Sequence, residues 1–159
     1  EHFPYMGFFQ KMAVCDVFVI LDNVKFKKNN FQNRNKFLNK SGDSEWFTVP
    51  VEKKAPSKLI KDVSVSQDSR WRRKMMIKLK QNLKVDLSEI YEPDTLLEIN
   101  MRSIRWCMKQ LDIQKRLILS SELPVVGKKS ELLANIVRFL DGDEYISGPS
   151  GRDYLDMSF

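Results

Sequence analysis

The stretch Asp16-Val-Phe-Val-Ile-Leu-Asp22 decides which fold the sequence predicts. An uninterrupted apolar run of this length, rich in β-branched and aromatic residues, is typical of a strand buried in a parallel sheet. Open α/β sheets bind their ligands at the carboxyl ends of such strands. Asp22 therefore stands where a catalytic carboxylate, acting as a base or orienting a hydroxyl, is expected.

The sequence predicts helices both before and after this strand. A turn at residues 3–7 predicts a short helix that runs to Ala13. Residues 66–69 mark a second helix start, and Thr95 with Glu98 forms a capping box before a third. Ser130 begins the last predicted helix. The apolar stripes of the later helices are Trp71, Met75 and Leu79; Leu97, Met101, Ile104, Met108 and Leu111; and Leu132, Leu133, Ile136, Val137 and Leu140.

Further short strands are predicted at residues 45–51, 60–65, 116–119 and 145–146. Residues 29–40 read as a polar, irregular segment with a turn at 39–43. The strand–helix–strand–helix order near the C-terminus favours parallel pairing. We therefore expect a single α/β domain over residues 1–159, with a mostly parallel sheet flanked by helices, Rossmann-like or nucleotidylyltransferase-like.

The composition indicates a domain with a real core and an anionic partner. Of the 159 residues, 42% are hydrophobic, and the formal net charge is +6. Basic residues concentrate at 25–40 and 70–80, and elsewhere the positive charge is spread along the chain. Spread charge is more typical of a solvated face than of a nucleic-acid groove, so we expect only weak, non-specific binding of nucleic acid.

The rarer residues restrict the chemistry further. Cys15 and Cys107 lie far apart in apolar or helical patterns, which favours two free, buried thiols. A chain with one histidine, His2, offers no histidine-rich metal site, and no metal is expected. No apolar run reaches the length of a membrane span and no signal peptide is visible, so a cytoplasmic location is expected.

The tail Tyr145-Ile-Ser-Gly-Pro-Ser-Gly-Arg152 predicts a phosphate site. A short strand runs into a loop in which Gly148 and Gly151 allow backbone N–H groups to face a ligand. Ser150 adds a hydroxyl group, and Arg152 adds a planar cation suited to phosphate. An ordinary turn with a solvated arginine explains the same residues equally well.

Other polar groups are candidates for substrate binding. Amide and guanidinium groups at Gln32, Asn33 and Arg34, with Asn23 nearby in sequence, suit a sugar or nucleotide, although a plain polar loop is an equal alternative. A second set of candidates for substrate binding follows the strand predicted at 116–119 and consists of Ser120, Ser121 and Glu122. Lys128 lies in Gly127-Lys-Lys-Ser130, which resembles the end of a P-loop but lacks its first glycine. The motif instead predicts the start of a helix, where the lysines are able to bind an anion.

Several ordered blocks of the sequence resemble the WbqC-like protein family. The blocks cover nearly the whole chain: Phe-Pro-Tyr-Met-Gly-Phe-Phe-Gln-Lys (3–11), Asp-Val-Phe-Val-Ile-Leu-Asp-Asn-Val (16–24), Gln-Asn-Arg-Asn (32–35), Trp-Arg-Arg-Lys (71–74), Ser-Ser-Glu-Leu (120–123), Gly-Lys-Lys (127–129) and Ser-Gly-Pro-Ser-Gly-Arg-Asp-Tyr-Leu (147–155). Members occur among bacterial genes for surface polysaccharide and O-antigen assembly. The resemblance implies a transferase that acts on an amino sugar.

Three departures from the family pattern stand out. The family opens with His-Gln-Pro-x-Tyr, and His2 aligns with that tyrosine, so the family histidine would precede residue 1. The connection at Lys80–Lys84 is shorter than in the family, through a deletion or missing residues near Gln81. The family also continues past Phe159. The resemblance therefore implies a domain truncated at both termini.

The expected function is acyl or aminoacyl transfer to a nucleotide-linked amino sugar, with no particular cofactor indicated. The expected partner is thus a nucleotide-linked or phosphorylated small molecule. Two alternatives remain open: a non-enzymatic nucleotide-sugar or phosphate-binding module within a biosynthetic complex, and a basic nucleic-acid-binding domain. A steep dependence of affinity on salt would distinguish the latter.

Overall fold

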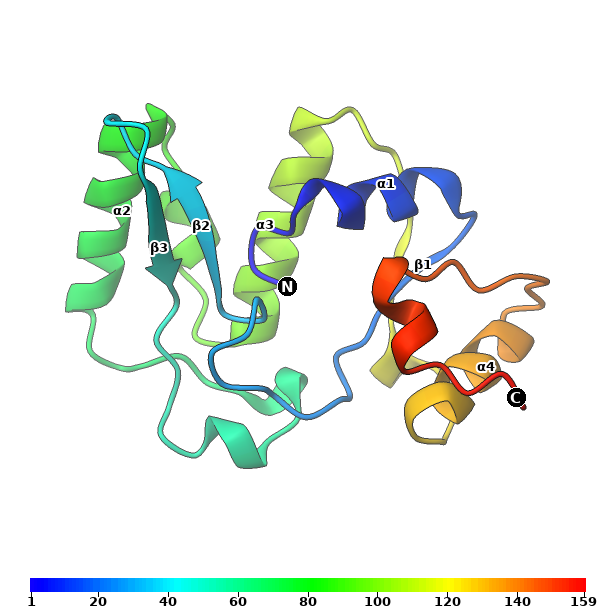
Figure 1. Cartoon of the computed structure of the whole chain (residues 1–159). Coiled ribbons are helices and arrows are strands. Elements are labelled where there is room, and N and C mark those ends of the chain that lie inside the picture. Colours follow the sequence, from blue (N-terminus) through cyan, green and yellow to red (C-terminus); the bar gives the residue numbers. More distant parts are fainter. The chain divides into compact units, whose positions relative to one another are not determined.

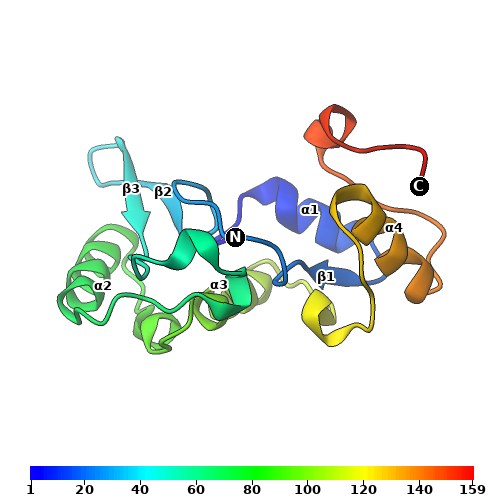
Figure 2. The same ribbon diagram turned by 90° about the horizontal axis from the view of Figure 1, so that it is seen from below.

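The helices and strands gather in two compact units, which are described separately (Figures 1 and 2). The computed structural model describes residues 1–159, apart from the side chain of Ser150, a predicted phosphate contact that lies outside the described part. Unit 1 comprises Glu1–Pro4 and Asn23–Asp112, and unit 2 comprises Tyr5–Asp22 and Ile113–Phe159. Each unit is therefore built from two separate segments of the chain.

Unit 1 is a hairpin packed on two helices. Strands β2 (Arg34–Leu38) and β3 (Ser44–Thr48) pair antiparallel, with Arg34 opposite Thr48 and Lys36 opposite Trp46. Helices α2 (Arg70–Leu83) and α3 (Leu96–Gln110) cover one face of this hairpin (Figure 2). Short 3₁₀ turns at Ala55–Ser57, Ile60–Asp62 and Ser88–Tyr91 connect these elements.

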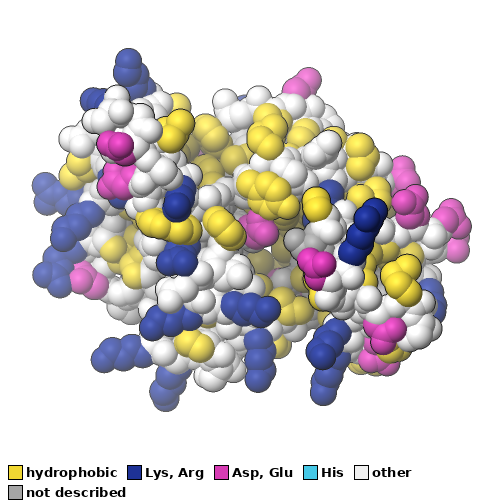
Figure 3. Space-filling model, in the orientation of Figure 1, with side chains coloured by type: hydrophobic (Ala, Val, Ile, Leu, Met, Phe, Trp, Pro, Cys, Tyr) yellow, Lys and Arg dark blue, Asp and Glu magenta, His cyan; other side chains and the backbone are white. Residues whose placement is uncertain are grey.

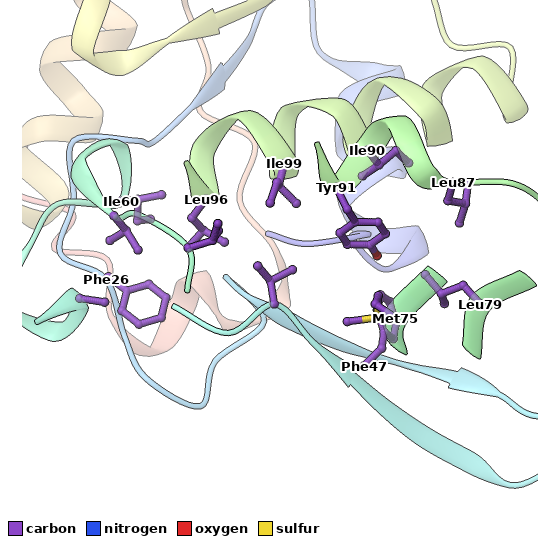
Figure 4. Close-up of a cluster of buried hydrophobic side chains, with 14 residues drawn as sticks. Phe26, Phe47, Ile60, Met75, Leu79, Leu87, Ile90, Tyr91, Leu96 and Ile99 are labelled. Atoms are coloured by element: carbon purple, nitrogen blue, oxygen red, sulfur yellow. The ribbon is translucent and has the colours of Figure 1, made fainter. Parts of the chain in front are cut away.

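The buried side chains of unit 1 confirm the predicted stripe of α2 and most of that of α3, whereas the predicted Leu111 is exposed. Figure 4 shows the side chains of α2, α3 and β3 converging on Tyr91, which is almost completely buried. Thr95 caps α3 by accepting a hydrogen bond from the Glu98 N–H at 3.3 Å, as the capping box predicted. Trp71 packs edge-to-face on Tyr91, as expected for a core residue of α2.

Arg72 of α2 has a structural role in unit 1. Its guanidinium donates to the carbonyls of Tyr91 and Pro93 at 2.7 and 2.9 Å, and it pairs with Asp94 at 2.7 Å. The Arg72 guanidinium therefore holds the turn before α3 against α2. Part of the basic cluster at 70–80 is thus committed to the fold.

Unit 2 is formed by a parallel pair of strands with two helices. Helix α1 (Met6–Val14) precedes β1 (Phe18–Ile20), and β1 pairs in parallel with β4 (Leu117–Leu119) in the register Phe18 with Leu117. A 3₁₀ turn (Ser120–Glu122) and helix α4 (Lys129–Phe139) follow, and a second 3₁₀ turn (Pro149–Asp153) lies near the C-terminus. The strand predicted at 116–119 is thus confirmed, and the structure pairs it with the strand predicted at 16–22.

The predicted mostly parallel sheet flanked by helices is wrong, and so is the Rossmann-like or nucleotidylyltransferase-like arrangement. The chain forms one parallel and one antiparallel pair, each a separate two-stranded sheet. The apolar dipeptide at residues 145–146 forms no strand, and Tyr145 remains 42% exposed. Two residues ahead of a proline at 149 are too few to extend a ladder.

Two further predictions, for residues 34–38 and residues 60–65, are wrong as well. Residues 34–38 form β2 although they were expected to be irregular. Alternation places Phe37 against the core and Lys36 in solvent, which makes a one-sided strand look polar overall. Residues 60–65 form a 3₁₀ turn and isolated bridges instead of a strand.

Both cysteines are free thiols, as expected, and are half-buried. None of the helices in the described part of the chain is long and apolar enough to cross a membrane.

His2 is completely buried in unit 1 among aromatic rings. A hydrogen bond of 3.2 Å joins its Nε2 to the Tyr91 hydroxyl group, and Phe3 and Phe47 contact the imidazole. Burial lowers the pKa of His2 from 6.5 to about 3, because the charged form loses its hydration. The folded protein therefore carries this imidazole in its neutral form.

We expect the stability to decrease as the pH falls below 6.5. In that range the unfolded chain binds a proton at His2 that the folded chain does not bind, down to a pH of about 3. The free energy of unfolding should lose on the order of 1.4 kcal/mol per pH unit from this residue. Urea unfolding from pH 6 to pH 4 measures the slope, and His2→Gln, which cannot titrate, should reduce it. Equal pH slopes for both proteins would contradict this assignment.

Candidate functional site

The carboxylate of Asp22 lies just after β1 and binds the residues that follow β4. Its Oδ1 accepts hydrogen bonds from Ser120 Oγ at 3.0 Å and from Ser121 N at 2.9 Å, and its Oδ2 accepts from Ser121 Oγ at 2.6 Å. The Asp22 N–H in turn donates to Ser120 Oγ at 3.2 Å. Because parallel strands end at the same edge, the structure brings Asp22, Ser120 and Ser121 together.

The environment of the Asp22 carboxylate favours a structural role over a catalytic one. Asp22 and Ser120 are both completely buried, and both carboxylate oxygens accept hydrogen bonds. Charge-assisted bonds of this kind are stronger than neutral ones. The carboxylate therefore links the ends of two strands, and its predicted catalytic role stays a prediction.

Glu122 is the last residue of the 3₁₀ turn after β4, and Lys128 lies at the start of α4. The Glu122 carboxylate accepts from the Leu119 N–H at 3.4 Å, and the Lys128 N–H donates to Glu131 at 3.3 Å. Both side chains are exposed. Lys128 is the N-cap of α4, as the Gly127-Lys-Lys-Ser130 interpretation predicted.

The glycine turn at the tail of unit 2 is closed by its own backbone. The Gly151 N–H donates to the Gly148 carbonyl at 2.8 Å, and the Leu155 N–H donates to the Gly151 carbonyl at 2.9 Å. The Gly151 N–H therefore donates within the turn, and its predicted phosphate contact stays a prediction.

The same turn borders a hollow and two polar groups from α1. The hollow, of about 370 Å³, is lined by Tyr145, Ser147, Arg152, Leu155 and Met157. A Cβ atom built on Gly148 would lie 3.9 Å from Lys11 Nζ and 4.0 Å from the Tyr5 hydroxyl oxygen. A cation and a hydroxyl group thus stand beside the turn.

Sequence reasoning missed Lys11 and Tyr5. Gly7 lacks a Cβ, and the Tyr5 ring occupies that space: a Cβ there would lie 2.4 Å from the ring. The signal was present in the block Tyr5-Met-Gly-Phe-Phe-Gln-Lys11, where a glycine stands two residues after an aromatic residue and one turn before a lysine.

The remaining candidates belong to unit 1. Asn33 is buried and donates through Nδ2 to the Val49 carbonyl at 2.8 Å, while Gln32 accepts from the Lys27 N–H at 2.7 Å. Arg34 lies over the Trp46 ring and donates to the Asn29 carbonyl at 2.6 Å. Asn23 is half-buried at the start of the unit. The predicted set therefore divides between the two units.

Among the described residues, no group of three or more His, Cys, Asp or Glu side chains is placed to hold a metal ion.

Comparison with known proteins now identifies the family. The WbqC-like protein family matches residues 1–159, so the chain belongs to that family. It is also 29% identical to the uncharacterized protein Rv1507c of Mycobacterium tuberculosis over 168 aligned positions, which cover 98% of this chain and 72% of that protein. No solved structure matches the chain.

Asp22→Asn should destabilise the protein by about 1–3 kcal/mol, because the new amide nitrogen is a donor and faces hydroxyl and N–H donors. Urea unfolding measures the loss. Asp16→Asn is the matched control, since Asp16 is exposed. Equal stability of the two variants would show that Asp22 does not hold the strand ends together.

The two glycines of the tail should respond differently to alanine. In Gly151→Ala the new Cβ would lie 2.7 Å from Ser147 Cβ, which cannot rotate away, so the melting temperature should fall. In Gly148→Ala the nearest atoms are 3.9 Å away and the backbone φ of −77° suits alanine, so the melting temperature should hardly change. Thermal melts of both variants test this contrast, and a larger loss for Gly148→Ala would refute it.

Proposed function

We propose that the chain is a transferase of bacterial surface polysaccharide biosynthesis that acts on a nucleotide-linked amino sugar. The observation that carries the proposal is the position of Lys11 and Tyr5 beside the Gly148 turn, next to the hollow lined by Arg152. The proposal also rests on membership of the WbqC-like family.

The proposed ligand contact is a phosphate group of the nucleotide sugar. Lys11 and Arg152 supply positive charge and the Tyr5 hydroxyl group supplies a donor, a combination that suits an anionic group. The hollow of about 370 Å³ is of the size that small-molecule sites have in proteins. In this proposal Lys11 makes a contact to the phosphate group that was expected of the Gly151 N–H.

The proposed reaction is transfer of an acyl or aminoacyl group to the amine of the sugar. The amine nitrogen forms an amide bond with the acyl carbonyl carbon, the bond to the activating group breaks, and the amine loses a proton. Asp22 stays the candidate base.

A non-enzymatic binding module is the second candidate function. The observation that favours it is the buried Asp22 carboxylate, whose hydrogen bonds to Ser120 and Ser121 occupy both oxygens. Incubation with an acyl donor followed by mass spectrometry of the sugar separates the two functions. A mass gain identifies the transferase, whereas binding without a mass gain identifies the module.

Arg152→Ala should weaken binding of nucleotide sugars roughly tenfold to a hundredfold, because charge-assisted contacts contribute about 1.5–3 kcal/mol. The side chain is exposed, so the melting temperature should hardly change. Calorimetric titration with a panel of nucleotide sugars and a thermal melt test both statements, and Lys11→Ala should behave in the same way.

The matched control is Arg116→Ala, which removes an exposed cation of the same unit ahead of β4. It should leave the affinity unchanged. Unchanged affinity of Arg152→Ala together with a large loss of stability would make Arg152 a structural residue and remove the phosphate site.

A further inference from the structure

The net positive charge of the protein lies in unit 1. That unit contains 20 Lys and Arg against 12 Asp and Glu, a formal charge of +8, whereas unit 2 contains 7 against 9, a charge of −2. Both basic clusters of the sequence, 25–40 and 70–80, fall within unit 1. Figure 3 shows that Lys and Arg side chains are frequent on the visible face of this unit. A basic unit of this kind attracts polyanions.

The outer face of the β2–β3 hairpin carries cations around an aromatic ring. Alternation along the strands turns Asn35, Phe37 and Phe47 toward the core. The residues on the opposite side include no acidic side chain, and we call them the outer face: Arg34, Lys36, Leu38, Ser44, Trp46 and Thr48. Helices α2 and α3 cover the inner face, so the outer face is open within unit 1.

Trp46 holds two of these cations. The Arg34 guanidinium carbon lies 4.3 Å from the centroid of the Trp46 ring, and Lys36 Nζ lies 4.9 Å from it. Such contacts orient a cation without neutralising it. Phe31, which is 48% exposed, lies with its ring centroid 6.1 Å from that of Trp46. The face thus combines fixed positive charge with exposed planar groups.

We propose that the outer face of the hairpin binds single-stranded nucleic acid without sequence preference. Phosphates would lie on Arg34 and Lys36, and bases would stack on the planes of Arg34 and Phe31. This binding is separate from the proposed transferase function, which rests on residues of unit 2.

The shape and the chemistry of the face favour this ligand. Leu38 is 67% exposed and Trp46 is 39% exposed, so the face is open and suits an extended chain rather than a small molecule enclosed in a pocket. An acidic polysaccharide would use the cations, but it has no planar bases to occupy the exposed rings. A single strand uses both.

The experiment measures the binding of a fluorescently labelled oligothymidine of about 20 nucleotides by anisotropy, in a series of salt concentrations. Contacts to two to four phosphates give a slope of log K against log salt between about −1.4 and −2.8. Unlabelled polygalacturonate, which carries carboxylates but no bases, is the competitor.

Three variants separate charge from stacking. Lys36→Gln should reduce the magnitude of the salt slope by about 0.7, as expected for one lost phosphate contact. Trp46→Ala should weaken binding at least about fivefold at a fixed salt concentration with little change of slope. Lys109→Gln is the matched control in the same unit, since this exposed lysine of α3 lies outside the hairpin, and it should change the affinity less than about twofold.

A thermal melt of each variant verifies folding, and Phe31→Ala replaces Trp46→Ala if the latter does not fold. Absence of binding at low salt would overturn the proposal, and so would equal losses for Lys36→Gln and Lys109→Gln. Tighter binding of polygalacturonate than of the oligonucleotide would assign the face to an acidic polysaccharide instead.

Discussion

The hydrogen bonds of Asp22 are the constraint on which unit 2 depends. Strands β1 and β4 are three residues each and lie far apart in the sequence, and their backbone pairing alone is short. The buried carboxylate adds bonds from Ser120 and Ser121, which continue the contact past the last paired residues. Helix α1 leads directly into β1, so the position of Lys11 depends on this pair of strands.

The sequence predicted those elements whose pattern is local and strong. The run Asp16–Asp22 predicted β1, and Thr95 with Glu98 predicted the start of α3. The sheet class failed because an apolar run shows that a strand is buried but not how many neighbours it has. At residues 145–146 the pattern was simply too short to specify a strand.

The candidate site was predictable only where its parts share a strand edge. Asp22 and Ser120 follow the two strands of a parallel pair, so their meeting was foreseeable. The position of Lys11 beside Gly148 depends on how α1 packs against the tail, which no local spacing encodes. The division of the chain into two units likewise redistributes charge in a way that the overall value of +6 conceals.

The discontinuity of unit 2 has a consequence for how the chain folds. Asp22 and Ser120 are separated by 98 positions, so their contact closes a long loop. Closing a flexible loop of that length costs about 4 kcal/mol of chain entropy. Nearly all of that loop belongs to unit 1. Once unit 1 is folded, this segment has already lost its conformational entropy, so closing the Asp22 contact costs less. Contact order accordingly favours unit 1 as the early-folding part, with the Asp22 contact forming late.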